Sequence, residues 1–192
     1  MAYYSVRELE SFKFKFLGKN VKISNKASIY NAETLSIGDN SRIDDFCVIS
    51  GRVSIGRNVH ITPFCLVAGG SPGIILSDFS TLAYGCKVFS QSDDYSGNSL
   101  VNSTIPRKFK SEIFSSVYVG RQAIIGASSV VMPGVRVEEG CSIGAGAVVI
   151  NSTAPWSIYV GVPARKVSEK SKQCISLLEQ YLQEEINDKS SI

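Results

Sequence analysis

Long apolar runs are missing from this sequence of 192 residues, and none approaches the roughly 18 apolar residues that a membrane-spanning helix needs. The opening MAYYSVRELE also lacks the charged-then-apolar pattern of a secretory signal. Charge of one sign is scarce, because the net charge is only +3 and no basic stripe typical of nucleic-acid binders is visible. We therefore expect a cytoplasmic protein without membrane insertion and without a nucleic-acid partner.

Histidine is nearly absent as well, since it occurs once, and the five cysteines are an odd number that cannot all pair with one another. A disulfide framework is therefore not expected. What the chain does have is apolar material, because 44% of its residues are hydrophobic. That is enough for one domain with a substantial core.

Aliphatic residues recur at every sixth position along most of the chain. The first block is Leu17, Ile23 and Ile29, then, after a two-residue slip, Ile37, Ile43, Ile49, Ile55, Ile61 and Val67. The phase slips by three residues through GGSPG and resumes at Leu76, Leu82 and Val88. A last block comprises Val119, Ile125, Val131, Val137, Ile143 and Val149. An α-helix cannot produce this period.

The fourth position after each aliphatic residue carries only small side chains: Val21, Ala27, Ser41, Cys47, Val53, Val59, Cys65, Ser80, Cys86, Ala123, Ser129, Val135, Cys141 and Ala147. Glycine often follows the aliphatic residue, as at Gly38 and Gly56, where we expect a tight corner with permissive backbone angles. The pattern predicts an all-β chain, a single-stranded left-handed parallel β-helix of about six coils stacked roughly 4.8 Å apart. On this pattern four cysteines fill small corner positions, with a metal site as the less favoured alternative, and Cys174 packs in a later helix.

Both ends of the repeat are expected to differ from its middle. Ser5 and Glu8 form a capping-box pattern, which predicts a short helix covering the first coil within residues 1–16. The solenoid is expected over 17–154, and the C-terminal extension over 155–192, with an amphipathic helix from 168 to about 187.

An insertion and two outward rows stand out from the repeat. Residues 91–116 have no six-residue phase, and a loop of this length is usually functional or disordered. Outward positions of the third strand are mostly apolar, which suggests a subunit interface: Ser28, Val48, Leu66, Lys87, Val130 and Val148. Outward positions of the second strand are more polar and include the histidine: Lys22, Arg42, His60, Thr81, Ile124 and Ser142.

The six-residue repeats, the inserted loop with SDDYSG and NSTIP, and the closing YVGVPARKV resemble the hexapeptide-repeat acyltransferase family over about residues 5–170, especially its galactoside, maltose and polysaccharide O-acetyltransferases. The resemblance implies a homotrimer with active sites between neighbouring coils, and acetyl-CoA as the acyl donor without a metal. It implies transfer of an acetyl group to a sugar hydroxyl in surface polysaccharide or lipopolysaccharide biosynthesis.

The resemblance also implies site residues. Galactoside and maltose enzymes carry their catalytic histidine on the loop where this chain has Asp93, so the role of general base passes to His60. Asp93 or Asp94, from a neighbouring subunit's loop, would orient the imidazole. Asp93, Asp94 and Tyr95 are also candidates to bind the sugar or nucleotide-sugar acceptor, the alternative being an Asx-turn with a packing tyrosine.

Candidate contacts to acyl-CoA follow from the family's binding mode. They are Ala127, Ala145, Asn151, Ser152, Arg165 and Lys166. Arg165 and Lys166 are the better phosphate ligands, unless they form a solvated surface. The basic residues Arg107, Lys108 and Lys110 are candidates for a nucleotide sugar's phosphates, or belong to a solvated loop.

Three other functions were weighed. An N-acetyltransferase acting on a nucleotide-linked amino sugar uses the same fold, and an amine needs less help from a base. A zinc hydratase on the same coil needs three histidines, which this chain does not have. A non-enzymatic solenoid that only binds partners fits the inserted loop and the closing motif less well.

Overall fold

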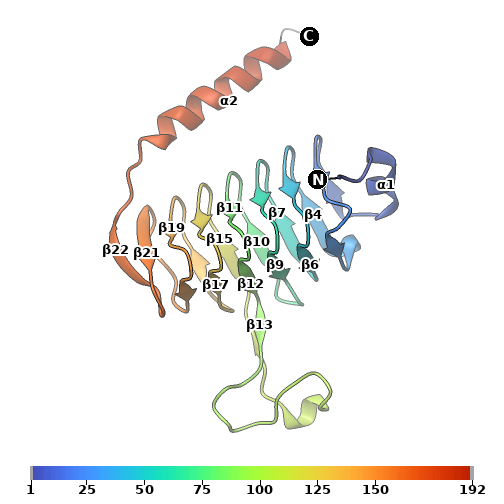
Figure 1. Cartoon of the computed structure of the whole chain (residues 1–192), viewed down its shortest axis with the longest axis vertical. Helices are drawn as coiled ribbons and strands as arrows, with labels where there is room; N and C mark the ends of the chain where they lie inside the picture. Colours follow the sequence, from blue (N-terminus) through green and yellow to red (C-terminus); the bar gives the residue numbers. More distant parts are fainter. Residues whose placement is uncertain (1, 191–192) are drawn as a thin grey trace.

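Three parallel sheets wrap around one core in the computed structural model, which describes residues 2–190 and side chains up to 187 (Figure 1). Met1 and residues 191–192, the outer ends of the predicted segments 1–16 and 155–192, lie outside the described residues. Successive turns add one strand to each sheet, so the predicted parallel β-helix is confirmed. It has six complete turns, and β21 adds a seventh rung to the second sheet.

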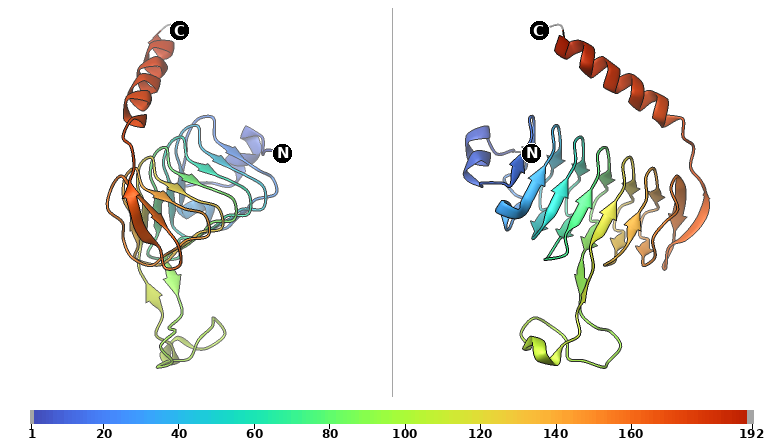
Figure 2. Two further views of the ribbon diagram at one scale, coloured as in Figure 1. Left: turned by 60° about the vertical axis from the view of Figure 1, so that its left-hand side comes forward. Right: turned by 180° about the vertical axis from the view of Figure 1, so that it is seen from behind.

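The three sheets form the flat walls of a triangular prism (Figure 2). The first sheet contains β1 (Phe16–Leu17), β4 (Leu35–Ile37), β7 (Val53–Ile55), β10 (Ile74–Leu76), β15 (Val117–Val119) and β18 (Arg136–Val137). The second contains β2 (Lys22–Ile23), β5 (Arg42–Ile43), β8 (His60–Ile61), β11 (Thr81–Leu82), β16 (Ile124–Ile125), β19 (Ser142–Ile143), β21 (Ser157–Val160) and β22 (Arg165–Glu169). The third contains β3 (Ser28–Ile29), β6 (Val48–Ser50), β9 (Leu66–Ala68), β12 (Lys87–Phe89), β17 (Val130–Val131) and β20 (Val148–Val149).

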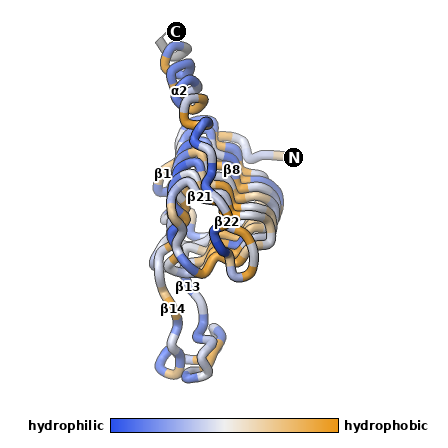
Figure 3. The backbone as a smooth tube through the Cα atoms, turned by 90° about the vertical axis from the view of Figure 1, so that its left-hand side faces the viewer, coloured by the Kyte–Doolittle hydropathy of each residue, from blue (hydrophilic) through white to orange (hydrophobic). Residues whose placement is uncertain are grey.

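The interior of the prism is filled by the repeating aliphatic residues. From Ile37 to Val149 every one of them is buried, and only Leu17 and Ile29, in the first coil, are partly exposed. Equivalent residues of neighbouring turns pair directly, as Ile37 does with Ile55 and Ile55 with Leu76. Viewed near the prism axis, the coils superimpose around this core (Figure 3).

Glycines after the aliphatic residues have a different purpose from the one predicted. A Cβ on Gly38 would lie 2.5 Å from the carbonyl carbon of Gly56 in the next coil, so close stacking of coils excludes any side chain there. The left-handed backbone angles fall instead on other corner residues, among them Asn40 (φ 59°), Asn58 (φ 53°) and Phe64 (φ 67°). Asparagine tolerates this region better than most residues.

The cysteines of the corner positions are core residues, as predicted. Cys47, Cys65 and Cys86 are at most 1% exposed, and their thiols donate to carbonyl oxygens of the following turn at 3.1–3.2 Å. Hydrogen bonding to Cys65 and burial both raise the pKa of the Cys47 thiol. A protonated, buried thiol of this kind acts as a small apolar side chain.

The short N-terminal helix α1 (Val6–Ser11) has the predicted capping box. The backbone amide of Ser5 donates to the Glu8 carboxylate at 2.7 Å, and the Glu8 amide donates back to the Ser5 hydroxyl at 3.3 Å. Leu9 is the helix residue that enters the core. A 3₁₀ turn, η1 (Ala32–Thr34), connects the first coil to the second.

The insertion leaves the solenoid as a ribbon rather than as an unpaired loop. Strands β13 (Gln91–Ser92) and β14 (Ile113–Phe114) pair antiparallel and carry the rest of the segment, including η2 (Arg107–Phe109), away from the prism (Figure 1).

The C-terminal segment begins with strands and ends in a helix. Residues 165–169, part of which was predicted as helix, form β22 because they pair antiparallel with β21 at the end of the second sheet. Helix α2 (Cys174–Ser190) then runs back along the corner between the first and second sheets. Tyr181 accepts a hydrogen bond from Asn58 at 3.2 Å, and Glu185 forms an ion pair with Arg57.

Candidate active site

His60 lies on the outer face of the second sheet, where the repeat predicts it. It belongs to β8, between Arg42 of β5 and Thr81 of β11. Its side chain is 38% exposed because Ile61, the next residue along the strand, takes the inward position. The imidazole is therefore accessible to a ligand while its backbone is held in a three-strand ladder.

Asp44 is the partner of this imidazole within the chain. Its Oδ2 lies 2.9 Å from His60 Nε2, and its Oδ1 accepts a hydrogen bond from Arg42 Nε at 2.6 Å. Arg42 also donates from a terminal nitrogen to Oδ2 at 3.2 Å, and the Tyr3 hydroxyl lies 3.5 Å from Oδ1. The result is a compact charged cluster on an otherwise regular sheet surface.

The carboxylate of Asp44 is ionised although its side chain is only 3% exposed. Burial alone favours the neutral acid, but the hydrogen bonds from Arg42 and His60 outweigh it and hold the pKa of Asp44 below its ordinary value. Those same contacts raise the pKa of Arg42. A buried carboxylate that stays charged can orient and neutralise a protonated imidazole.

Asp44 was not among the residues that the sequence singled out. The available signal was geometric, because one turn is 18 residues and Asp44 precedes His60 by 16, one position beyond the core residue Ile43. That offset places it at the corner directly beside the next turn. The spacing alone therefore indicates that Asp44 lies near His60, whereas the direction of the Asp44 side chain is known only from the structure.

Asp93, Asp94 and Tyr95 belong to the insertion, which projects from the prism beyond the ribbon of β13 and β14 (Figure 1). Asp94 makes an Asx-turn, accepting from the amide of Ser96 at 2.8 Å, and hydrogen bonds from that amide and from the hydroxyls of Ser96 and Ser99 lower its pKa. Tyr95 is 87% exposed. A contact between these residues and His60 would therefore have to form between two protomers. Their predicted roles, in orienting the imidazole and in binding the acceptor, remain predictions.

The basic residues of the insertion have partners within it. Lys110 is almost buried, with Nζ 3.1 Å from Glu112 and 3.9 Å from Asp93. Arg107 stacks over the ring of Phe114, and Lys108 over that of Phe109. These contacts stabilise the insertion and leave Arg107 and Lys108 as its outer cations.

The predicted acyl-CoA contacts fall in three places. Ala127 and Ala145 occupy the corner between the second and third sheets in successive coils, where the Gly146 amide donates to the Ala127 carbonyl at 2.7 Å. Ser152 is tied to the backbone, because its hydroxyl accepts from the Arg136 amide at 3.0 Å. Arg165 and Lys166 lie exposed on β22, and Lys166 forms an ion pair with Glu169. Asn151 is exposed beside Ser152.

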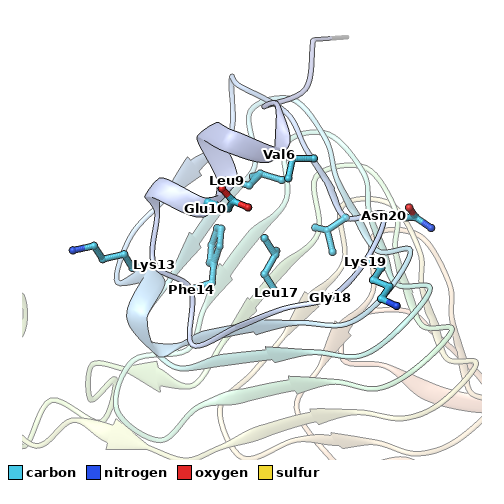
Figure 4. A pocket seen from close by; sticks show the side chains of 10 residues that line it. Val6, Leu9, Glu10, Lys13, Phe14, Leu17, Gly18, Lys19 and Asn20 are labelled. Atoms are coloured by element: carbon cyan, nitrogen blue, oxygen red, sulfur yellow. The ribbon is translucent and has the colours of Figure 1, made fainter.

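Three cavities of the single chain lie away from His60. One of about 640 Å³ opens between α1 and the first coil and is lined by Val6, Leu9, Phe14, Leu17 and their neighbours (Figure 4). Two others lie on the first sheet, around Arg52 and around Tyr118. None of these three contains His60, so a catalytic groove at the imidazole would need a second wall.

Among residues 2–190, no group of three or more histidine, cysteine, aspartate or glutamate side chains is arranged to hold a metal ion. Within the same residues, neither helix is long and apolar enough to cross a membrane.

Comparison with known proteins agrees with the repeat. The family model "Bacterial transferase hexapeptide (six repeats)" matches residues 35–69 and 116–151, which flank the insertion. A dTDP-4-amino-4,6-dideoxy-D-glucose acyltransferase from Escherichia coli is 36% identical over 179 residues, 92% of this chain and 93% of its own length.

Solved structures extend the comparison to three dimensions. AntD, an N-acyltransferase from Bacillus cereus, in complex with dTDP and 3-hydroxybutyryl-CoA, has a TM-score of 0.94 at 42% identity, covering 96% of this chain and 98% of its own. A variant of AntD in which cysteine replaces a serine, in complex with dTDP-4-amino-4,6-dideoxyglucose and coenzyme A, has the same TM-score and identity. The match covers 95% of this chain and 98% of the variant's chain. A maltose O-acetyltransferase from Clostridium difficile 630 covers 88% of this chain and 78% of its own at a TM-score of 0.55 and 18% identity, which shows likeness of fold alone.

Proposed function

This chain belongs to the hexapeptide-repeat acyltransferase family, and from that premise we propose that it transfers an acyl group from an acyl-CoA to the amino group of a dTDP-linked amino sugar. The likeness to AntD carries the proposal, because it extends over at least 95% of the chain and so includes the insertion and the C-terminal strands. AntD has been solved with both kinds of substrate, a dTDP-amino sugar and a coenzyme A thioester.

The sequence-based preference for O-acetylation of a polysaccharide sugar is not supported. The relatives that cover almost the whole chain are an amino-sugar acyltransferase and an N-acyltransferase, whereas the maltose O-acetyltransferase shares only the fold. The alternative weighed beside it, an N-acyltransferase on a nucleotide-linked amino sugar, agrees better with these relatives.

His60 serves as the general base in this proposal. The amine nitrogen attacks the thioester carbon, a C–N bond forms, and the imidazole takes the proton that the nitrogen must lose. The C–S bond then breaks, and the departing coenzyme A sulfur receives that proton. A neutral imidazole suits both transfers because its ordinary pKa is close to neutral pH.

The homotrimer is also proposed, because it would supply the second wall that His60 lacks in one chain. Val48 and Leu66, and beyond the exposed Lys87 also Val130 and Val148, form a mostly apolar row of partly buried side chains on the third sheet. An apolar row of this kind is typical of a subunit interface. Asp93, Asp94 and Tyr95 of one protomer's insertion would then reach a neighbour's sugar site.

The donor would lie against the C-terminal coils in this proposal. Ala127 and Ala145 present small side chains at one corner, along which a pantetheine chain can pass. Arg165 and Lys166 supply cations for its phosphates, since charge-assisted hydrogen bonds to phosphate are among the stronger polar contacts. Asn151 and Ser152 remain weaker candidates because the Ser152 hydroxyl already accepts a backbone hydrogen bond.

The experiment compares two acceptors that differ in one atom. Purified protein is incubated with acetyl-CoA or 3-hydroxybutyryl-CoA and either dTDP-4-amino-4,6-dideoxyglucose or the matching dTDP-6-deoxyglucose with a 4-hydroxyl. We expect thiol release with the amine and none above background with the hydroxyl. Equal release with the hydroxyl, or release with neither, would overturn the proposal.

A further inference from the structure

The side chain of Asp44 points from its own coil toward the following coil, where it contacts His60. The backbone of Asp44 is fixed by its amide, which donates to the Ile61 carbonyl at 3.0 Å, and its side chain is 3% exposed. Arg42 donates from Nε to Oδ1 at 2.6 Å and from a terminal nitrogen to Oδ2 at 3.2 Å. The imidazole is the nearer partner of Oδ2, at 2.9 Å, so this oxygen is shared between the guanidinium and the ring.

Asp45, the next residue, shows that a carboxylate at this corner has a choice of direction. Its side chain binds the Ser24 hydroxyl and lies 3.6 Å from Lys26 Nζ, so it faces the preceding coil. Asp44 faces the following coil instead. The two neighbouring carboxylates therefore have separate partners, which makes Asp45 a matched control for Asp44.

The contact with Asp44 determines which imidazole nitrogen carries the proton in the neutral ring. An ionised carboxylate only accepts hydrogen bonds, so Nε2 must be the N–H donor and Nδ1 must hold the lone pair. Nδ1 has no hydrogen-bond partner among residues 2–190. The charged or titratable groups around the ring are Asp44 and Arg42, with Tyr3 and Tyr84 close to Arg42.

We propose that Asp44 is a positioning residue, which holds His60 as the tautomer protonated on Nε2 and so presents the Nδ1 lone pair to the acceptor amine. This inference rests on the proposed function, in which His60 is the base. Nδ1 takes the proton released as the C–N bond forms, Asp44 offsets the charge of the resulting imidazolium, and Nδ1 returns the proton to the sulfur when the C–S bond breaks. Asp44 itself remains ionised throughout.

The single histidine allows a direct test by NMR. Protein labelled with ¹⁵N and purified through a tag without histidine gives one pair of imidazole nitrogens, which a long-range ¹H–¹⁵N correlation assigns to a tautomer at a pH where the ring is neutral. We expect the Nε2–H form in the wild type and in Asp45→Asn. In Asp44→Asn we expect a mixture of both tautomers.

Kinetics with the amino-sugar acceptor provides the second readout. Asp44→Asn should lower kcat about 10- to 100-fold, which is at most the lower limit of a whole general-base contribution because His60 itself is kept, and should leave KM for acyl-CoA within about twofold of the wild type. Asp45→Asn should match the wild type in both constants. A purely structural role for Asp44 would leave the tautomer unchanged in the variant.

The outcomes separate this inference from the function it rests on. A wild-type ring protonated on Nδ1, or an Asp44→Asn variant with wild-type kcat, overturns the positioning role. If the wild-type protein acylates no amino sugar, the proposed function is wrong. The NMR spectrum then still shows whether Asp44 holds His60 as the tautomer protonated on Nε2. The wild-type spectrum needs no variant, so misfolding of Asp44→Asn cannot obscure it.

Discussion

His60 is the residue to which we assign the role of general base. The position follows from the repeat, because each two-residue strand of the second sheet, from β2 to β19, presents one residue outward and only His60 among these residues is a histidine. What the sequence could not supply was its partner. Sequence reasoning assigned Asp93 or Asp94 to the ring, while Asp44 makes the contact within the chain at 2.9 Å. A carboxylate's direction at a corner depends on side-chain packing that periodicity does not encode.

Replacing His60 by alanine tests its role as base. We expect His60→Ala to lower kcat for the amino-sugar acceptor about 100-fold, because general-base catalysis contributes about that much, with KM for acyl-CoA unchanged. Steady-state kinetics with Thr81→Ala as the control measures this, since Thr81 is the next outward residue on the same sheet. A His60→Ala enzyme with wild-type kcat would remove the imidazole from the mechanism.

Strands and corners were the most predictable elements. The six-residue period identified the inward residues of almost every strand, and Ser5 with Glu8 identified the start of α1. Two elements were not predicted because they depend on strand pairing outside the repeat. They are the ribbon of β13 with β14, and β22, which pairs antiparallel with β21. Such pairings leave no periodic trace in the sequence.

Corner glycines should be intolerant of any side chain. We expect Gly38→Ala to destabilise the protein by about 1–3 kcal/mol, the range seen for overpacking, because its Cβ would press on the backbone of Gly56. Urea denaturation measures the effect, with Ser36→Ala as the control, because Ser36 is the outward residue of β4, the strand that ends just before Gly38. Equal stability of the two variants would contradict the close stacking of coils.

The burial of the corner cysteines Cys47, Cys65, Cys86 and Cys141 leads to a prediction about which thiols a reagent can reach. Four of the five cysteines are buried, and only Cys174 at the start of α2 is partly exposed. Ellman's reagent should therefore modify one thiol rapidly in the native protein and all five after denaturation. Rapid modification of several thiols in the native state would show that the core is open at these corners. The result also sets the background of the thiol-release assay.

The proposed trimer would complete the catalytic groove beside His60. The cavities found lie at α1 and on the first sheet, whereas His60 lies on the second sheet with one side open. The sequence indicated the third-sheet row as an interface, and the structure places Val48 and Leu66 in adjacent rungs of it. In the proposed trimer, the matching wall would belong to a neighbouring protomer.

A charge in the apolar row should dissociate the proposed trimer. We expect Val48→Asp, whose neighbours on the adjacent strands are the uncharged Ser28 and Leu66, to elute as a monomer in size-exclusion chromatography with light scattering, because an unpaired carboxylate in an apolar interface is costly. Ile75→Asp, on the first sheet where the side chain is 49% exposed, should remain a trimer. The reverse pattern would move the interface to the first sheet.

The linkage in the product tests N-acyl transfer most directly. After incubation with acetyl-CoA and dTDP-4-amino-4,6-dideoxyglucose, NMR of the purified product correlates the new acyl carbonyl with its attachment point on the sugar. We predict an amide at the sugar nitrogen. An ester on a sugar hydroxyl, or recovery of the amino sugar unchanged, would contradict the account.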